Sequence, residues 1–178
     1  MKALTLPLFL ALTLGTAAHA GDVVCESRLS EQKIDNNVVV PEGKACDIRD
    51  VKIDGNVIAK SNASVTLRNA KVEGNVIAEK GANVDVQDAR IDGNLQADES
   101  NAVAVARSEV DGNIQVKKAS SVQVQNAEID GDIQLSDNGT IHVEGNDIKG
   151  NLQCQSNQNA SGGNNKVDGS REGQCSGF

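Results

Sequence analysis

The sequence predicts an all-β protein, a single-stranded parallel β-helix (β-solenoid) of about seven coils. Three observations support this. Seven glycines recur with a 19-residue period, β-branched residues recur at a fixed distance from them, and apolar and polar residues alternate with a period of two. A fixed period of this length is typical of solenoids, in which each repeat stacks on its neighbours. The glycines are Gly55, Gly74, Gly93, Gly112, Gly131, Gly150 and Gly169.

Each 19-residue coil is predicted to hold three short strands separated by polar bends. The residue two before the glycine is β-branched in every coil, from Ile34 to Val167, as a strand buried in a stack requires. Apolar residues two and four after the glycine mark another strand. A pair ten and twelve after it, such as Val65 and Leu67, marks the third. Because left-handed β-helices usually carry hexapeptide units, we expect these coils to be right-handed.

The glycine column and the amides beside it are expected to shape each coil. Asn36 occupies the glycine position one period before Gly55. Asn tolerates a left-handed backbone, so we expect one left-handed bend per coil at this column. The next residue is Asn in most coils and Asp132 in one, which predicts an amide ladder along the stack. A Gln column follows two residues later. A binding surface made of amides is the alternative interpretation.

The two ends of the chain differ from the repeats. Residues 1–20 are predicted to be a signal peptide, with Lys2, an apolar stretch over 4–14, and the cleavage site Ala18-His19-Ala20 before Gly21. The apolar stretch is too short to span a bilayer. We therefore expect a periplasmic or secreted protein without membrane insertion. The remaining chain is divided into an N-terminal cap (21–33), the coils (34–154) and a disulfide-pinned C-terminal cap (155–178).

Four cysteines in an exported chain favour disulfides over metal ligation or free thiols. They allow three connectivities. Cys25 and Cys46 lie near the start and Cys154 and Cys175 near the end, and the members of each pair are separated by slightly more than one period. The crossed pairings would require the two ends of a long stack to meet. We therefore predict one disulfide at each end, Cys25–Cys46 and Cys154–Cys175.

A column of acids precedes the glycines. Carboxylates stacked about 4.8 Å apart repel by roughly 1 kcal/mol per pair in water. In the first coils a cation two residues earlier can pair with the acid, at Lys52, Lys71 and Arg90. Later this companion becomes acidic, which predicts a patch of Glu109, Asp111, Glu128 and Asp130. Oxygen ligands at this density suit Ca²⁺, or Mg²⁺ that retains its waters. A solvated acidic face is the alternative.

The composition argues against several functions. Without residues 1–20, which hold one Lys and no acid, the formal charge moves from -8 to -9. With no basic cluster, we expect neither nucleic acid nor anionic membrane as a partner. The only aromatic residue after the signal is Phe178, so there is no aromatic platform for sugars or bases. The only histidine there, His142, has no nucleophile motif beside it. We therefore expect no enzyme activity and no cofactor, Ca²⁺ excepted.

An apolar strip is predicted on the outside of the first coils. Val39, Ile58 and Ile77 occupy the outward position three after the glycine. Such a strip either binds a partner or lies under the N-terminal cap. These features predict a monomeric, non-catalytic structural or protein-interaction module whose partner is an envelope or extracellular protein. The alternative is a weak divalent-cation-binding or carbohydrate-active surface factor.

The repeated pattern Ile/Val-Asp-Gly-Asn-Val resembles that of exported bacterial β-helix repeat proteins, most of them uncharacterised. The segment from Gly150-Asn151-Leu152-Gln153-Cys154 to Glu172-Gly173-Gln174-Cys175 resembles a closing segment of such proteins. The resemblance implies an architecture and no activity. Bactofilins, which are cytoplasmic and polymerise end to end, are only distantly similar through their short β-helical repeats. Since this chain carries an export signal and predicted caps, their function is not transferred to it.

Overall fold

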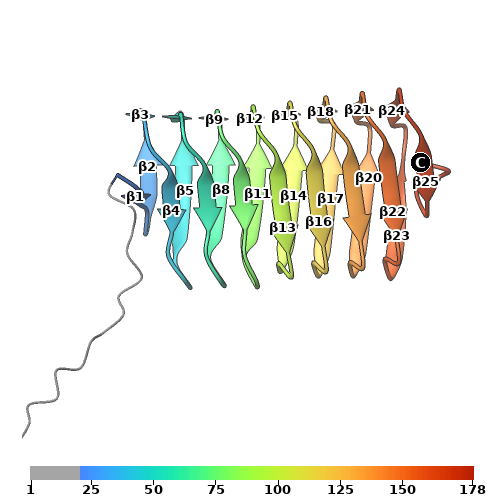
Figure 1. The fold of residues 1–178 in the computed structure, drawn as a ribbon, viewed down its shortest axis with the longest axis horizontal. Helices are drawn as coiled ribbons and strands as arrows, with labels where there is room; N and C mark the ends of the chain where they lie inside the picture. The colour runs from blue at the N-terminus through green and yellow to red at the C-terminus, as the bar shows by residue number, and fades with distance from the viewer. Residues whose placement is uncertain (1–20) are drawn as a thin grey trace, which may run out of the picture.

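The protein is a straight rod of stacked coils (Figure 1). The computed structural model describes residues 21–178, and the predicted signal peptide, residues 1–20, lies outside the described residues. Three parallel sheets run along the rod, and residues 21–178 contain no helix. The predicted all-β parallel β-helix is therefore confirmed. We name the sheets front, rear and upper after their positions in Figure 1.

The strands of each sheet follow one another at intervals of three along the chain. The front sheet contains β1 (Val23–Val24), β4 (Val38–Val40), β7 (Val57–Ala59), β10 (Val76–Ala78), β13 (Leu95–Asp98), β16 (Ile114–Lys117), β19 (Ile133–Ser136), β22 (Leu152–Gln155) and β25 (Arg171–Gly173). The rear sheet contains β2 (Arg28–Ser30), β5 (Ala45–Arg49), β8 (Ser64–Arg68), β11 (Asn83–Gln87), β14 (Ala102–Ala106), β17 (Ser121–Gln125), β20 (Thr140–Glu144) and β23 (Asn159–Gly163). The upper sheet contains β3 (Lys33–Ile34), β6 (Lys52–Ile53), β9 (Lys71–Val72), β12 (Arg90–Ile91), β15 (Glu109–Val110), β18 (Glu128–Ile129), β21 (Asp147–Ile148) and β24 (Lys166–Val167).

The coils are in register and wind right-handed. Each residue pairs with its equivalent one repeat later in the neighbouring strand, as Val76 does with Leu95. Front strands run downward and rear strands upward in Figure 1, while successive coils progress from left to right, which makes the winding right-handed. The rear and upper sheets each have eight strands, one more than the seven or so coils predicted. The difference arises because both predicted cap segments contribute strands, β1 and β2 at one end and β23, β24 and β25 at the other.

The core is a narrow column of aliphatic side chains. Residues that alternate along each strand point inward, so Ile53, Val57 and Leu67 are fully buried within one coil. Small aliphatic residues dominate because three sheets converge closely on the axis of the rod. Phe178 packs against the C-terminal part of this core. The fold is therefore stabilised mainly by the burial of many aliphatic side chains along the whole rod, and not by any single large residue.

The glycine column does not turn the backbone left-handed, so that prediction was wrong. All seven glycines and Asn36 are among the described residues, and none has a positive φ. The left-handed residues lie five positions earlier in the repeat and include Asp50, Asn69 and Asp88. The glycines are needed because the coils approach too closely for a side chain. A Cβ on Gly93 would lie 2.5 Å from the carbonyl oxygen of Gly74 in the preceding coil.

A second left-handed position shifts midway along the rod. In the early coils it falls at Gly43, Asn62 and Gly81, inside turns such as the one closed by Ala63 N–H donating to Lys60 O at 2.9 Å. From Glu99 onward it occurs one residue earlier in the repeat. The front strands from β13 to β22 are correspondingly four residues long instead of three. The rod thus has two halves that differ in the turn below the front sheet.

Candidate functional site

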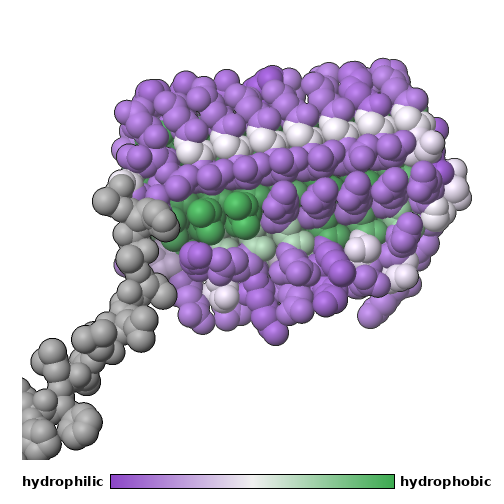
Figure 2. Space-filling model, in the orientation of Figure 1, coloured by the Kyte–Doolittle hydropathy of each residue, from purple (hydrophilic) through white to green (hydrophobic). Residues whose placement is uncertain are grey.

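The predicted apolar strip lies on the outer face of the front sheet. Val39 pairs in register with Ile58, and Ile58 with Ile77, so the three side chains stack along the rod. Each lies between two buried residues of its strand and is itself half-buried. Figure 2 shows them as a hydrophobic row that hydrophilic residues continue toward the C-terminus. The structure therefore brings together all three residues proposed as an interaction surface.

The N-terminal segment extends this strip and does not cover it. Val24 in β1 pairs with Val39 and leaves 55% of its surface exposed. Because β1 and β2 continue the front and rear sheets, residues 23–30 lie in line with the coils. Of the two interpretations of the strip, burial under an N-terminal cap is wrong. The repeat pattern missed Val24 because the first coil, from Val23 to its partner Val38, is shorter than the later ones.

A shallow groove of about 410 Å³ continues from the strip along the front sheet. Its floor includes the small side chains Ala78 and Ala97, and one wall is the outward row that begins at Ile77. Asp98 and Lys117 form part of the opposite wall. The Gln column supplies the rest of the outward row, at Gln96, Gln115 and Gln134. The groove is thus apolar at its base and bordered by amides.

The Asn column beside the strip forms the predicted amide ladder. The backbone N–H and side-chain Nδ2 of Asn56 both donate to Asn37 Oδ1, at 2.8 and 3.0 Å. The same pair of bonds repeats between successive Asn residues through Asn113. Asp132 continues the ladder as an acceptor for Asn151. Because these amides bond one another and the backbone, the column holds the register of the coils.

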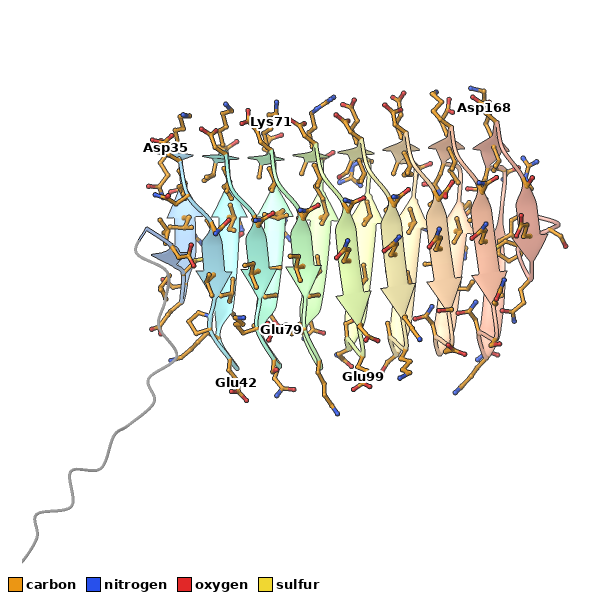
Figure 3. All side chains as sticks on the ribbon, viewed as in Figure 1. Asp35, Glu42, Lys71, Glu79, Glu99 and Asp168 are labelled. Carbon is orange, nitrogen blue, oxygen red and sulfur yellow. A yellow bond between two sulfur atoms is a disulfide. The ribbon has the colours of Figure 1, made fainter. Side chains whose placement is uncertain are left out.

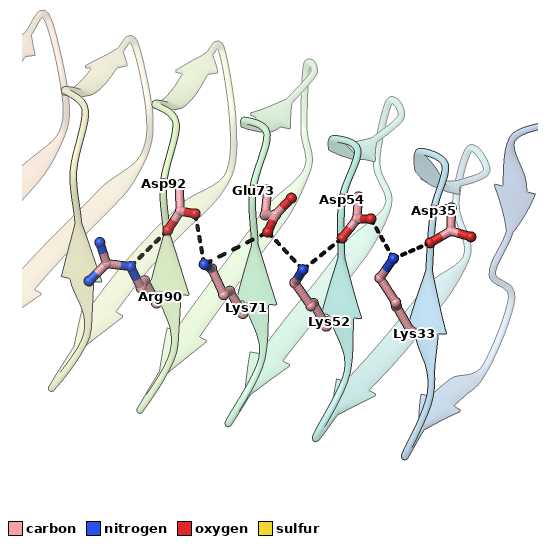
Figure 4. Close-up of polar contacts among 8 residues, drawn as sticks. All are labelled: Lys33, Asp35, Lys52, Asp54, Lys71, Glu73, Arg90 and Asp92. Carbon is pink, nitrogen blue, oxygen red and sulfur yellow. Dashed lines mark hydrogen bonds and ion pairs between the residues drawn. The ribbon is translucent and has the colours of Figure 1, made fainter.

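The acids and cations of the upper edge form a continuous ion ladder (Figure 4). Lys33 contacts Asp35 of its own coil at 2.5 Å and Asp54 of the next at 2.8 Å. Hydrogen bonds from Lys33 and Lys52 lower the pKa of Asp54. The same alternation continues through the remaining residues of the ladder, Glu73, Lys71, Asp92 and Arg90. The predicted pairing of these charges is confirmed, and it offsets the repulsion between stacked acids.

The four acids predicted as a metal site are not gathered around one point. Arg90 bonds Asp111 at 2.6 Å and also pairs with Glu109. Glu128 lies 3.7 Å from Lys149. Among residues 21–178, no group of three or more His, Cys, Asp or Glu side chains has an arrangement that could hold a metal ion. Arg90 therefore pairs with two of the four acids and Lys149 with a third, and Ca²⁺ binding by the patch stays a prediction.

His142 has two side-chain partners that its sequence neighbourhood did not indicate. Its Nδ1 lies 3.0 Å from Ser161 Oγ in the next coil, and its Nε2 lies 3.1 Å from Glu144 Oε2. The Ser161 hydroxyl donates to the backbone oxygen of Ile141 at 3.2 Å. The Ser161 hydroxyl therefore has two neighbours, the imidazole of His142 and the backbone oxygen of Ile141.

Comparison with known families places most of these features in one sequence family. The model of the family described as "Protein of unknown function (DUF3737)" matches residues 24–150. The chain belongs to this family. The matched DUF3737 segment includes the whole apolar strip and the ion ladder from Lys33 to Asp92. No curated protein and no solved structure matches the chain.

Two disulfides join the ends of the rod to their neighbouring coils, as predicted. Cys25–Cys46 and Cys154–Cys175 have Cα–Cα distances of 5.7 and 5.4 Å, and there is no free cysteine among the residues described. The first bridge lies inside the segment that matches DUF3737 and the second lies beyond it. Two such bridges suit a non-reducing environment. Within residues 21–178, the structure has no helix with the length and apolarity to cross a membrane.

Buried amides near the C-terminal end were not anticipated. Asn138 is fully buried, accepts a hydrogen bond from Ala119 N–H at 2.8 Å, and donates to Asn157 Oδ1 at 2.9 Å. Asn146 and Asn165 form an equivalent pair at the next corner of the coil. The two preceding coils hold Ser100 and Ala119 at the first corner and Ser108 and Ala127 at the second, so the change to Asn was the available signal. Each amide satisfies backbone groups at a corner of the final coils.

Proposed function

We propose that this DUF3737 chain is an exported, non-catalytic structural or protein-interaction module, with the front sheet as its docking surface. The observation that supports this most strongly is the uncovered strip of Val39, Ile58 and Ile77, continued by Val24. Stacked aliphatic side chains on an otherwise polar surface are typical of protein-binding sites. The rigid, ladder-braced sheet beneath them keeps the strip flat, which limits the entropy lost when a partner binds.

The proposed location is a periplasm or the extracellular space. The two disulfides support a non-reducing compartment, and the signal-like residues 1–20 support export. An envelope or extracellular protein is the proposed partner class. The proposed lack of catalysis is supported by the Ser161 hydroxyl, which has a backbone carbonyl oxygen, that of Ile141, as a hydrogen-bond acceptor.

Site-specific photo-crosslinking in producing cells tests the docking surface. A photoreactive residue replaces Ile58 on the front sheet in one variant and Thr66 on the rear sheet in the other. Both positions are outward-facing, half-buried and in the same coil, so they form a matched pair. We expect a discrete protein adduct from position 58 and none from position 66. Equal adducts from both positions, or none from position 58, would contradict the proposal.

A further inference from the structure

We propose that the occupant of the front sheet is a second copy of this chain, with the two rods side by side and parallel. The inference rests on the proposed function, because it names a partner for the same docking surface. It departs from the monomer expected from sequence. Three properties of the face support it: its lack of charge, its self-matching columns and its area.

The front sheet carries few charged side chains, although the protein as a whole has a negative net charge. Strands β4, β7, β10, β19 and β22 contain no charged residue. The terminal strand β25 carries Arg171 and Glu172 and lies outside the proposed contact. Figure 3 shows that Asp35, Lys71 and Asp168 project from the upper edge, and Glu42, Glu79 and Glu99 from the lower edge. The two charged residues in the central strands, Asp98 and Lys117, have opposite signs and pair in register at the margin of the face. Two front sheets can therefore approach without strong repulsion.

The outward column of the front sheet is complementary to itself. A two-fold axis parallel to the rod brings each outward residue opposite its own counterpart, because the coils have the same spacing in both copies. The aliphatic residues then meet aliphatic residues over the first coils. Over the later coils amides meet amides, and each amide is both donor and acceptor. The amide-bearing residues of this column are Gln96, Gln115, Gln134 and Gln153. Glu172 of β25 ends the column and lies beyond the proposed contact.

The opposite orientation is disfavoured by the same pattern. If the rods were antiparallel, Ile58 and Ile77 would face the Gln side chains of the other copy. Burying an amide against aliphatic groups without a hydrogen bond costs about 1–3 kcal/mol per group in proteins. Only the parallel arrangement avoids this penalty in all coils. The distribution of residues along one column therefore selects the direction of pairing as well as the face.

The area of the face suits a reversible dimer. The eight front strands from β1 to β22 lie about 4.8 Å apart and span about 34 Å, and most are three to four residues long, which adds about 10–14 Å. The contact would bury roughly 400 Å² per copy, which is below the size of standard interfaces and typical of weak, transient contacts. We expect a dissociation constant in the upper micromolar range, with dimers that separate on dilution.

Sedimentation equilibrium of the purified disulfide-bonded protein tests the pairing. We expect the wild type to change from monomer to dimer between about 1 µM and about 1 mM. Ile58→Arg places two positive charges opposite each other and should weaken dimerisation at least tenfold. Thr66→Arg adds the same charge to the rear sheet and should dimerise as the wild type does. A wild type that stays monomeric throughout, or equal dimerisation by both variants, would overturn the inference.

Cysteine crosslinking tests the direction. Gln96→Cys and Gln134→Cys are prepared separately, with the native disulfides intact, and oxidised at a concentration that favours dimers. In the parallel arrangement each variant forms a crosslinked dimer with itself. In antiparallel rods Gln134 would face the aliphatic end of the other copy, so Gln134→Cys would crosslink with Ile58→Cys and not with itself, which would refute the proposed pairing. If the purified protein is monomeric while position 58 still crosslinks in cells to a protein of different mass, the pairing fails and the docking surface stands.

Discussion

Replacing Gly93 by Ala tests the reason for the glycine column. The added Cβ would lie 2.5 Å from Gly74 O, 2.7 Å from Gly74 C and 2.8 Å from Asn75 Oδ1. Ordinary contacts of this kind are longer than 3.4 Å. The two coils must therefore separate locally by several tenths of an ångström. These atoms cannot move away easily. The two atoms of Gly74 belong to the backbone, and Asn75 Oδ1 is held by its hydrogen bonds with Asn94.

The expected destabilisation follows from the bonds that this separation lengthens. Gly93 N–H donates to Gly74 O at 3.2 Å, and Asn94 N–H donates to Asn75 Oδ1 at 2.8 Å. Overpacking costs about 1–3 kcal/mol, and a weakened hydrogen bond adds about 1 kcal/mol. The free energy of unfolding should fall by about 2–4 kcal/mol. In a domain of this size that lowers Tm by roughly 5–15 °C.

Thermal and urea unfolding followed by far-UV circular dichroism measure this loss, with Gly163→Ala as the matched control. Gly163 has no atom within 4 Å of its would-be Cβ and no positive φ, so its replacement should change stability by less than about 1 kcal/mol. Gly93→Asn separates the two explanations. If position 93 required a left-handed backbone, Asn would be tolerated better than Ala. If the coils approach too closely there, the larger Asn side chain would be tolerated less well than Ala. A Gly93→Asn protein more stable than Gly93→Ala would refute the close-approach reasoning.

Four further predictions concern the ladders and the ends. Asn94→Ala should lower the free energy of unfolding by about 1–3 kcal/mol in urea titrations, because it leaves the half-buried backbone and side-chain N–H donors of Asn113 without their acceptor; an unchanged midpoint would contradict this. Reduction of the two disulfides should destabilise the protein by about 3 kcal/mol per bridge in the chain-entropy model, measurable as a lower urea midpoint in reductant. The lowered pKa of Asp54 means that its contribution is complete above the unfolded-state value of about 3.9 and is lost as pH falls through the folded-state pKa, so Asp54→Asn should flatten stability against pH below 4. Calorimetry with Ca²⁺ tests the cation-binding alternative: binding that Glu128→Gln/Asp130→Asn removes would support it, and no heat from the wild type would end it.

The fold was predictable because one period controls every coil. A 19-residue repeat with β-branched and alternating apolar positions is sufficient to specify three strands, their register and the ladder of amides. The pairings of Cys25 with Cys46 and of Lys52 with Asp54 and Glu73 followed from the same spacing. Each of these depends only on which residues lie side by side, either in the same coil or in neighbouring coils.

Other features depended on geometry that the period does not encode. A glycine needed because two coils approach closely cannot be distinguished in the sequence from one needed for a left-handed bend. Only the φ angles distinguish the two. The contribution of Val24 was hidden because its coil is shorter than the repeat. The contact of His142 with Ser161 required the register of β20 and β23 in a coil whose apolar pattern has faded. The sequence therefore placed the strip correctly but not its extension.

The ladder from Asn37 to Asn151 has a consequence for how the length of this protein can evolve. Every rung accepts the backbone N–H of the equivalent residue in the next repeat, and the rungs other than Asp132 also donate a side-chain amide to the rung before. Duplicating or deleting one whole repeat within either half would rejoin equivalent bonds and alter the rod by about 4.8 Å. Length is thus a quantity that whole-repeat insertions can tune in fixed steps, with the change of turn at Glu99 as the one junction where repeats are not interchangeable.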